Sequence, residues 1–120
     1  MTQTHEIFKK DALKELSSQF ESWGFTDIRS PHLLDRYPST RTVGGFQPDM
    51  TFKKHNVQFI VEVETREILD KEETWEEWLV YSDRVKEIKG CFWILVPQGQ
   101  SFDFIRKINE MRVEASVHEV

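Results

Sequence analysis

Three acidic residues lie at positions from which they could bind one metal ion together. Asp49 follows Pro48 at the start of a short apolar segment, and Glu62 and Glu64 lie in an alternating segment that begins at Val57. In a β-strand, side chains two residues apart share a face and are about 7 Å apart along the chain. If the two segments pair as a hairpin, Asp49 lies beside the two glutamates and three carboxylates converge.

Carboxylates that crowd together raise one another's pKa, so a cation or basic side chains must neutralise them. Mg²⁺ prefers oxygen ligands and is usually held by one or two carboxylates together with phosphate oxygens of a substrate. The three acids therefore predict a Mg²⁺ or Mn²⁺ site that hydrolyses phosphodiester bonds. We expect Asp49, Glu62 and Glu64 to be both the metal ligands and the catalytic residues, with the carbonyl of Val63 as a further ligand.

The motif Pro48-Asp49, followed after a spacer by Glu62-Val63-Glu64-Thr65-Arg66, resembles the signature of the PD-(D/E)xK nuclease superfamily, the restriction-endonuclease-like proteins. Within it the chain is most similar to archaeal-type Holliday junction resolvases, which share the order of Gly24-Phe25 after an amphipathic helix, Arg29-Ser30-Pro31 and a polar loop. The similarity extends over roughly residues 5 to 97. It implies an α/β fold with an αβββαβ core, in which helices flank a mixed central sheet, and a metal-dependent endonuclease that cleaves DNA, including branched or junction DNA.

The chain departs from the family pattern at Glu64, because the family usually has a lysine there. In the family that lysine is thought to orient the attacking water and to offset negative charge, although some restriction endonucleases of the superfamily carry glutamate. Glu64 would then bind metal or position water, and Arg66 or Lys71 would supply the missing positive charge.

Two other interpretations of the acids remain open. In the first, the chain is a catalytically degenerate nuclease fold that serves as a binding or assembly module. In the second, Glu62 and Glu64 belong to an ion-pair network with Arg66, Arg84 or Lys86.

A helix is predicted from about Thr4 to Trp23, because apolar residues recur in it at helical spacing and Gly24 follows it. Members of the resembled family often take a further metal ligand from this helix. Glu15 is the expected ligand and Asp11 the alternative, whereas as solvated acids both would pair with neighbouring lysines.

Basic residues around the acids are the expected contacts to DNA phosphates. Arg36 and Arg41 lie in a polar segment from Pro31 to Gly45, which is interpreted as a mobile loop or as an ordinary surface connection. The remaining expected contacts are Lys53, Lys54 and Arg66.

The other expected elements follow from periodicity and from turn residues. Strands are expected at 25–30, at 91–96 and at the sheet edge at 112–117, and helices at 70–89 and 101–111. Because a helix separates them, Ile60 to Glu64 and Phe92 to Val96 should be parallel neighbours.

The 120 residues fit one domain, 1–120, with 38% hydrophobic and 31% charged residues. The composition and the lack of a long apolar run predict a soluble, cytoplasmic protein with no membrane partner.

A net charge of −5 argues against a wholly basic surface, and residues 61–120 carry most of the excess acid. Two-strand cleavage would suit a homodimer, and a larger protein partner could supply further basic surface.

Overall fold

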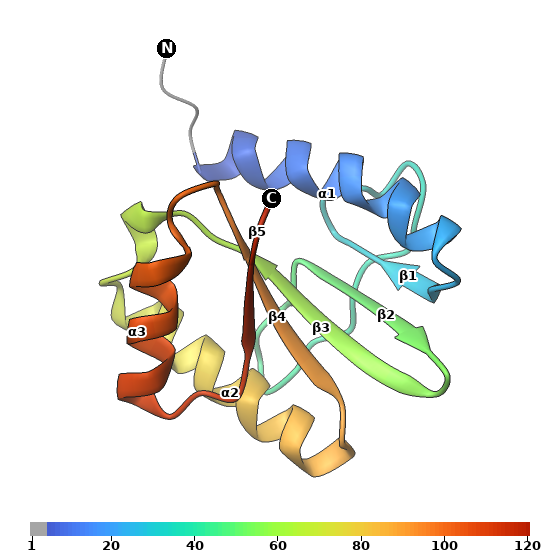
Figure 1. The fold of residues 1–120 in the computed structure, drawn as a ribbon. Helices are drawn as coiled ribbons and strands as arrows, with labels where there is room; N and C mark the ends of the chain where they lie inside the picture. Colours follow the sequence, from blue (N-terminus) through green and yellow to red (C-terminus); the bar gives the residue numbers. More distant parts are fainter. Residues whose placement is uncertain (1–4) are drawn as a thin grey trace.

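A computed structural model of the protein describes residues 5–120. Five strands form one sheet in the order β1-β2-β3-β4-β5, and helices pack on both of its faces (Figure 1). The elements are α1 (His5–Ser22), β1 (Thr26–Arg29), β2 (Met50–Lys54), β3 (Val57–Val63), the 3₁₀ turn η1 (Arg66–Ile68), α2 (Glu72–Ile88), β4 (Cys91–Val96), α3 (Ser101–Met111) and β5 (Ser116–Glu119). The predicted α/β fold with a mixed sheet between helices is confirmed.

The hairpin of β2 and β3 has a two-residue turn, His55-Asn56. Both residues have positive φ values, 51° and 66°, as a tight type I′ hairpin turn requires. The turn fixes an antiparallel register in which Met50 is opposite Val61. Asp49, one residue before β2, therefore lies beside Glu62, as the alternating pattern predicts.

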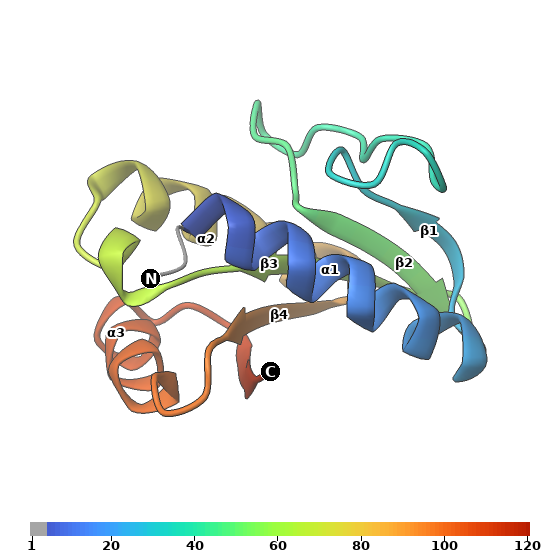
Figure 2. The same ribbon diagram turned by 90° about the horizontal axis from the view of Figure 1, so that it is seen from above.

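The helix α1 covers one face of the sheet, whereas α2 and α3 pack on the other (Figures 1 and 2). Leu13 and Phe20 of α1 pack against Phe52 of β2 and Val61 of β3. Since side chains alternate along a strand, the neighbouring residues Ile60 and Glu62 face the side of α2.

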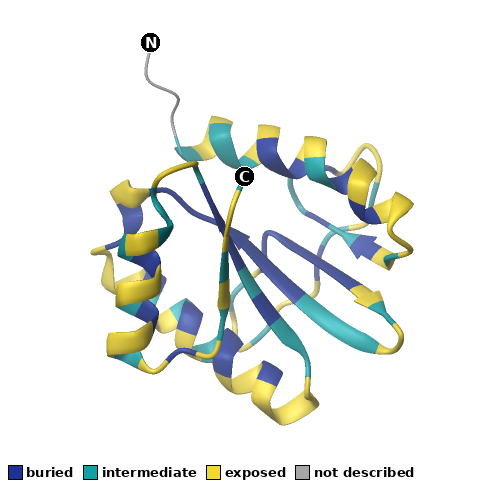
Figure 3. Cartoon of the chain, viewed as in Figure 1, coloured by how far each residue is buried: buried dark blue, intermediate teal, exposed yellow. Residues whose placement is uncertain are grey.

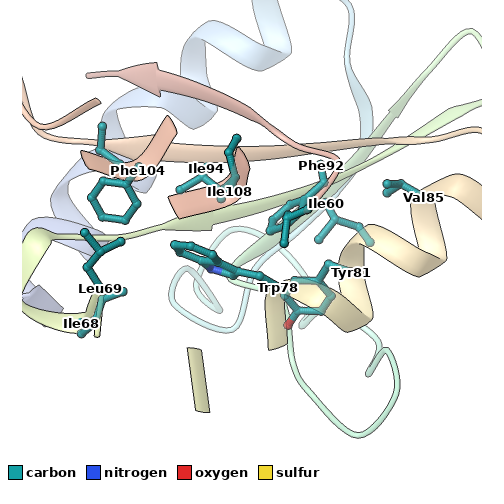
Figure 4. Packing of buried hydrophobic residues seen from close by; sticks show 12 residues of the cluster. Ile60, Ile68, Leu69, Trp78, Tyr81, Val85, Phe92, Ile94, Phe104 and Ile108 are labelled. Atoms are coloured by element: carbon teal, nitrogen blue, oxygen red, sulfur yellow. The ribbon is translucent and has the colours of Figure 1, made fainter. Parts of the chain in front are cut away.

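The strand β4 is largely buried, as its continuous apolar sequence predicts, whereas β5 is largely exposed (Figure 3). The strand β4 runs parallel to β3, with Ile60 opposite Phe92 and Glu62 opposite Ile94. The expected parallel pair is thus confirmed. Trp78 and Tyr81 of α2 and Phe104 of α3 pack against this part of the sheet (Figure 4).

The last strand begins later than predicted, at Ser116 instead of Arg112. Arg112 forms the left-handed C-cap of α3, with φ 58°, and the N–H of Val113 donates to the carbonyl of Ile108. Because the end of α3 occupies these residues, the strand can form only after them. It is the expected edge strand, and it pairs in parallel with β4.

The polar segment between β1 and β2 is held to the rest of the protein by specific contacts. Val43 and Phe46 form a short bridge, and their side chains pack against the core cluster that contains Trp78 and Tyr81 of α2. At Gly44, with φ 57°, an added Cβ would lie 2.5 Å from a methyl carbon of Val80, so α2 and this segment approach closely. The hydroxyl of Thr40 donates to the carbonyl of Pro48 over 2.8 Å and so fixes the chain just before Asp49.

Within residues 5–120, none of the helices combines the length and the apolar character that crossing a membrane requires.

Candidate metal centre

Asp49, Glu62 and Glu64 meet at one end of the β2–β3 hairpin. Each offers a carboxylate oxygen such that the three atoms lie within 4.8 Å of one another. All three residues are buried, with 4%, 3% and 5% of their surface exposed. The predicted convergence of these acids is confirmed, and oxygen ligands at this spacing could hold a metal ion.

Hydrogen bonds hold two of these acids in a fixed arrangement. The backbone N–H of Asp49 donates to Oε2 of Glu62 over 2.7 Å, and the N–H of Val63 donates to Oδ2 of Asp49 over 2.9 Å. The hydroxyl of Ser30 donates to the carbonyl of Asp49 over 2.7 Å and so ties the same residue to the end of β1. The acids are thus positioned by the backbone of neighbouring strands, and they need no rearrangement to meet.

Two basic side chains contact Asp49 on its other oxygen. Nζ of Lys9, in α1, lies 3.1 Å from Oδ1, and Nε2 of His32 donates to the same oxygen over 2.9 Å. His5, one helical turn before Lys9, places Nε2 3.8 Å from Oε1 of Glu64 and hydrogen-bonds Thr65 through Nδ1. Three basic residues therefore border the acids from α1 and from the segment after β1.

The helix α2 contributes a fourth carboxyl group to the cluster. Glu77 is close enough to Glu62 to help raise its pKa, and it accepts a 2.7 Å hydrogen bond from the hydroxyl of Tyr81. Nε1 of Trp78 donates to Oε2 of Glu64 over 3.1 Å. The crowded glutamates at the start of α2 fit a solvated acidic face, but Glu77 is partly buried and faces the site.

The carboxyl groups do not share the negative charge equally. Burial alone would raise the pKa of Asp49, but the hydrogen bond from His32 and the charge of Lys9 lower it. Burial and the charge of Asp49 raise the pKa of Glu62 well above its ordinary value, and the same two causes raise the pKa of Glu64 to about 8. In the protein without metal, Asp49 is therefore ionised near neutral pH while Glu64 mostly retains its proton.

Lys9 stays charged in this environment although it is largely buried. Burial would lower its pKa, but the charges of Asp49, Glu62 and Glu64 raise it above the ordinary lysine value. His5 behaves in the opposite way, because burial and the charge of Lys9 lower its pKa. Lys9 is therefore the permanent positive charge that faces the three acids.

The expected ligand from the first helix is not part of the cluster. Glu15 is exposed, and it lines, together with Asp11, a separate cavity of about 650 Å³ between α1 and the strands β4 and β5. Trp93 and His118 line the same cavity. The side of α1 that faces the acids carries Lys9 instead, because positions 5, 9 and 13 share one face of a helix.

The five basic residues expected to contact DNA are spread over the surface. Arg36 lies 3.7 Å from Glu21, and Arg66 forms a 2.8 Å ion pair with Asp103. Nζ of Lys54 donates to the carbonyl of Trp23. Arg41 and Lys53 line one cavity together with Arg84 of α2.

The geometry counts against a purely structural ion-pair network around Glu62 and Glu64. Arg66, one expected partner, is engaged with Asp103, and Arg84 lines the cavity that contains Arg41. The contacts to the acids come instead from Lys9, His5 and His32.

Comparisons with protein-family models, with curated proteins and with solved structures found no match to this chain.

Proposed function

We propose that this protein is a divalent-metal-dependent nuclease domain that hydrolyses phosphodiester bonds in DNA. The observation that carries this proposal is the meeting of Asp49, Glu62 and Glu64 within 4.8 Å, with a charged lysine against them. Buried acids that touch one another oppose folding, so such a cluster is a candidate functional site.

The order of elements supports a restriction-endonuclease-like core. The chain runs α1, β1, β2, β3, α2, β4, which is the αβββαβ order implied by the resemblance. Pro48-Asp49 leads into β2, and Glu62 and Val63 end β3 with Glu64 directly after it, which fits the motif of the PD-(D/E)xK nucleases. These positions support the proposal that the chain has a restriction-endonuclease-like core.

The donor set fits a hard divalent cation such as Mg²⁺ or Mn²⁺. It consists of carboxylate oxygens, and burial together with the charge of Asp49 raises the pKa values of Glu62 and Glu64, so a bound cation would replace their protons. A bound ion would lower the pKa of the attacking water and stabilise negative charge on the phosphate oxygens. Asp49 and Glu62 would hold it, with Glu64 as a further ligand or as the group that orients water.

Lys9 supplies the positive charge that the motif lacks at Glu64. Its ammonium lies 3.1 Å from Asp49 and is attracted by all three acids, so it can stabilise the charge that develops on a phosphate bound there. Arg66, one of the residues expected to take this role, is held by Asp103. The lysine of the motif would thus be replaced in space by a residue of α1.

DNA is the proposed substrate, including branched and junction forms. Two chains acting as a homodimer would place one acid cluster on each strand, since strand pairs in duplex and junction DNA are related by twofold symmetry.

A second candidate function is a catalytically degenerate nuclease fold that acts as a binding or assembly module, with a larger protein as partner. The ion pair of Lys9 with Asp49 favours it, because a protein that never binds metal can neutralise its acids through this lysine and through protons on the glutamates. It predicts no cleavage with any divalent ion.

A nuclease assay with a matched pair of lysine variants tests the proposal. Purified protein is incubated with single-stranded, duplex and four-way-junction DNA in Mg²⁺, in Mn²⁺ or in EDTA. We expect cleavage of at least one DNA form only with metal, and Lys9→Met should lower kcat about a hundredfold, as loss of one donor to a developing anion does. Affinity for Mn²⁺ should stay the same or increase, because a nearby positive charge has been removed.

Lys10→Met is the control, because Lys10 is the exposed neighbour of Lys9 in the same helix. It should cleave like the wild type. Equal activity of the Lys9 and Lys10 variants would contradict the role of Lys9, and no cleavage of any DNA with either metal would favour the binding module.

A further inference from the structure

A cavity of about 390 Å³ opens on the sheet face that faces α2. Its floor is formed by residues of β1, β2 and β3, one wall by residues 41–43 and the other by Arg84 and Ile88 of α2. The close contact of Gly44 with Val80 holds the first wall against the helix. The cavity is therefore a groove between two secured walls, which we call the basic groove.

The charge of this groove is opposite to that of the whole protein. Arg29, Arg41, Lys53 and Arg84 line it together with a single acid, Asp27. Four cations against one acid leave a net charge of +3 here, in a chain with a net charge of −5. Such a local positive region attracts anions that the rest of the surface repels.

Two of these cations have no acidic partner among residues 5–120. Asp27 lies 3.1 Å from Nε of Arg29 and 3.9 Å from Nζ of Lys53, so it serves both of them. For Arg41 and Arg84, both exposed, the described part of the chain provides no carboxylate within salt-bridge distance. Their guanidinium groups can thus bind a ligand without first breaking an ion pair.

The groove lies next to the acid cluster on the same face of the sheet. Ile60 is part of its floor, and Glu62 follows two residues later in β3. Two residues of a strand span about 7 Å, and their side chains share a face. A chain of phosphates in the groove would therefore be one to two nucleotide lengths from the acids.

We infer that the basic groove binds the phosphate backbone of single-stranded nucleic acid beside the acid cluster. Its volume is that of a site for a small ligand, so it encloses a short piece of one strand and not both strands of a duplex. None of the twelve lining residues is aromatic, so the contacts are to phosphates and not to stacked bases. The choice of a nucleic acid among polyanions rests on the proposed function.

Binding without metal tests this inference separately from catalysis. The anisotropy of a fluorescein-labelled oligothymidylate is measured in EDTA over a range of salt concentrations, for the wild type and for the double variant Arg41→Gln/Arg84→Gln. We expect Kd to increase about tenfold. The salt dependence, as log K against log salt, should become shallower by about 1.4, which is the loss of two phosphate contacts to a single strand.

The control is Lys10→Gln/Lys86→Gln, which removes the same total charge from exposed lysines outside the groove. It should bind within about twofold of the wild type, since screened distant charges contribute little. The single variant Arg84→Gln, which should have about half the effect on the salt dependence, guards against misfolding of the double variant. Thermal melting of all variants should match that of the wild type.

Three results would overturn the inference: no binding by the wild type, equal binding by groove and control variants, or duplex DNA of the same length bound as tightly as the single strand. The proposed function is tested separately, by the cleavage assay. A protein that binds the single strand through the groove but never cleaves it would refute the nuclease and leave the groove intact. If the protein cleaves DNA but the groove variant binds the single strand as tightly as the wild type does, the nuclease is supported and the inference about the groove is wrong.

Discussion

Replacing Asp49 by asparagine is expected to abolish metal-dependent cleavage of DNA. Asp49 is the acid that remains ionised in the free protein, and its two oxygens meet the backbone of β3 on one side and Lys9 and His32 on the other. The amide is close in size to the carboxylate but carries no charge, so it cannot hold a divalent ion against the neighbouring lysine. Activity should fall by more than the ~100-fold that loss of a mere supporting contact costs.

Initial cleavage rates at saturating Mn²⁺ measure this effect, and Asp83→Asn is the matched control. Asp83 is an exposed acid of α2, outside the acid cluster, so its variant should cleave like the wild type. Cleavage by Asp49→Asn at the rate of Asp83→Asn would show that the activity arises elsewhere. A circular-dichroism spectrum that matches the wild type would establish that the variant is folded.

Replacing Glu64 by glutamine is expected to stabilise the metal-free protein at pH 8 by a few kcal/mol, at about 1.4 kcal/mol per unit of pKa shift. Burial and the charge of Asp49 raise the pKa of Glu64 from 4.5 to about 8 in the folded state. The folded protein thus binds a proton that the unfolded chain releases. This contribution to stability is complete below pH 4.5, and it is lost as the pH rises towards 8. Glutamine still accepts the hydrogen bond from Trp78, but it has no proton to lose.

Urea unfolding in EDTA at a series of pH values between 4.5 and 8 measures this difference. The wild type should lose stability over that interval, and Glu64→Gln should lose less of it. Glu76→Gln, a change at an exposed glutamate of α2, should follow the wild type. Parallel curves for all three proteins would contradict a buried, protonated Glu64.

Added Mn²⁺ should reverse the ranking at pH 8. A ligand that binds only the folded state stabilises it according to its concentration and affinity. The wild type should gain this stability, and Glu64→Gln should gain less because it has lost one ligand.

The hairpin could be predicted from the sequence because the patterns that determine it are local. Alternation in β3 and the two-residue turn at His55-Asn56 set the register, and the register brings Asp49 beside Glu62. Short-range patterns of this kind carry over directly into a strand pair. The end of the chain was less certain, because Arg112 and Val113 suit a strand as well as a helix cap.

The residues around the acids could not be identified in the same way. Lys9 and Glu77 lie on helices that look amphipathic in sequence, and only packing decides which polar residue faces the site. One signal was present for Lys9, since His5, Lys9 and Leu13 lie four residues apart on one helix face. His32 reaches Asp49 from an irregular segment, for which no periodicity exists.

The basic groove shows the same limit of sequence patterns. Arg41 and Arg84 are far apart in the chain and belong to elements of different type, and the sheet brings them together. Periodicity within one element contains no information about such a pair.

We propose that Asp49, Glu62 and Glu64 together hold a divalent ion. Anomalous diffraction from a crystal soaked in Mn²⁺ would locate this ion. We predict one anomalous peak between these three side chains, within bonding distance of their carboxylate oxygens. A crystal that shows no peak there, while Lys9 keeps its ion pair with Asp49, would show that these acids do not form a metal site.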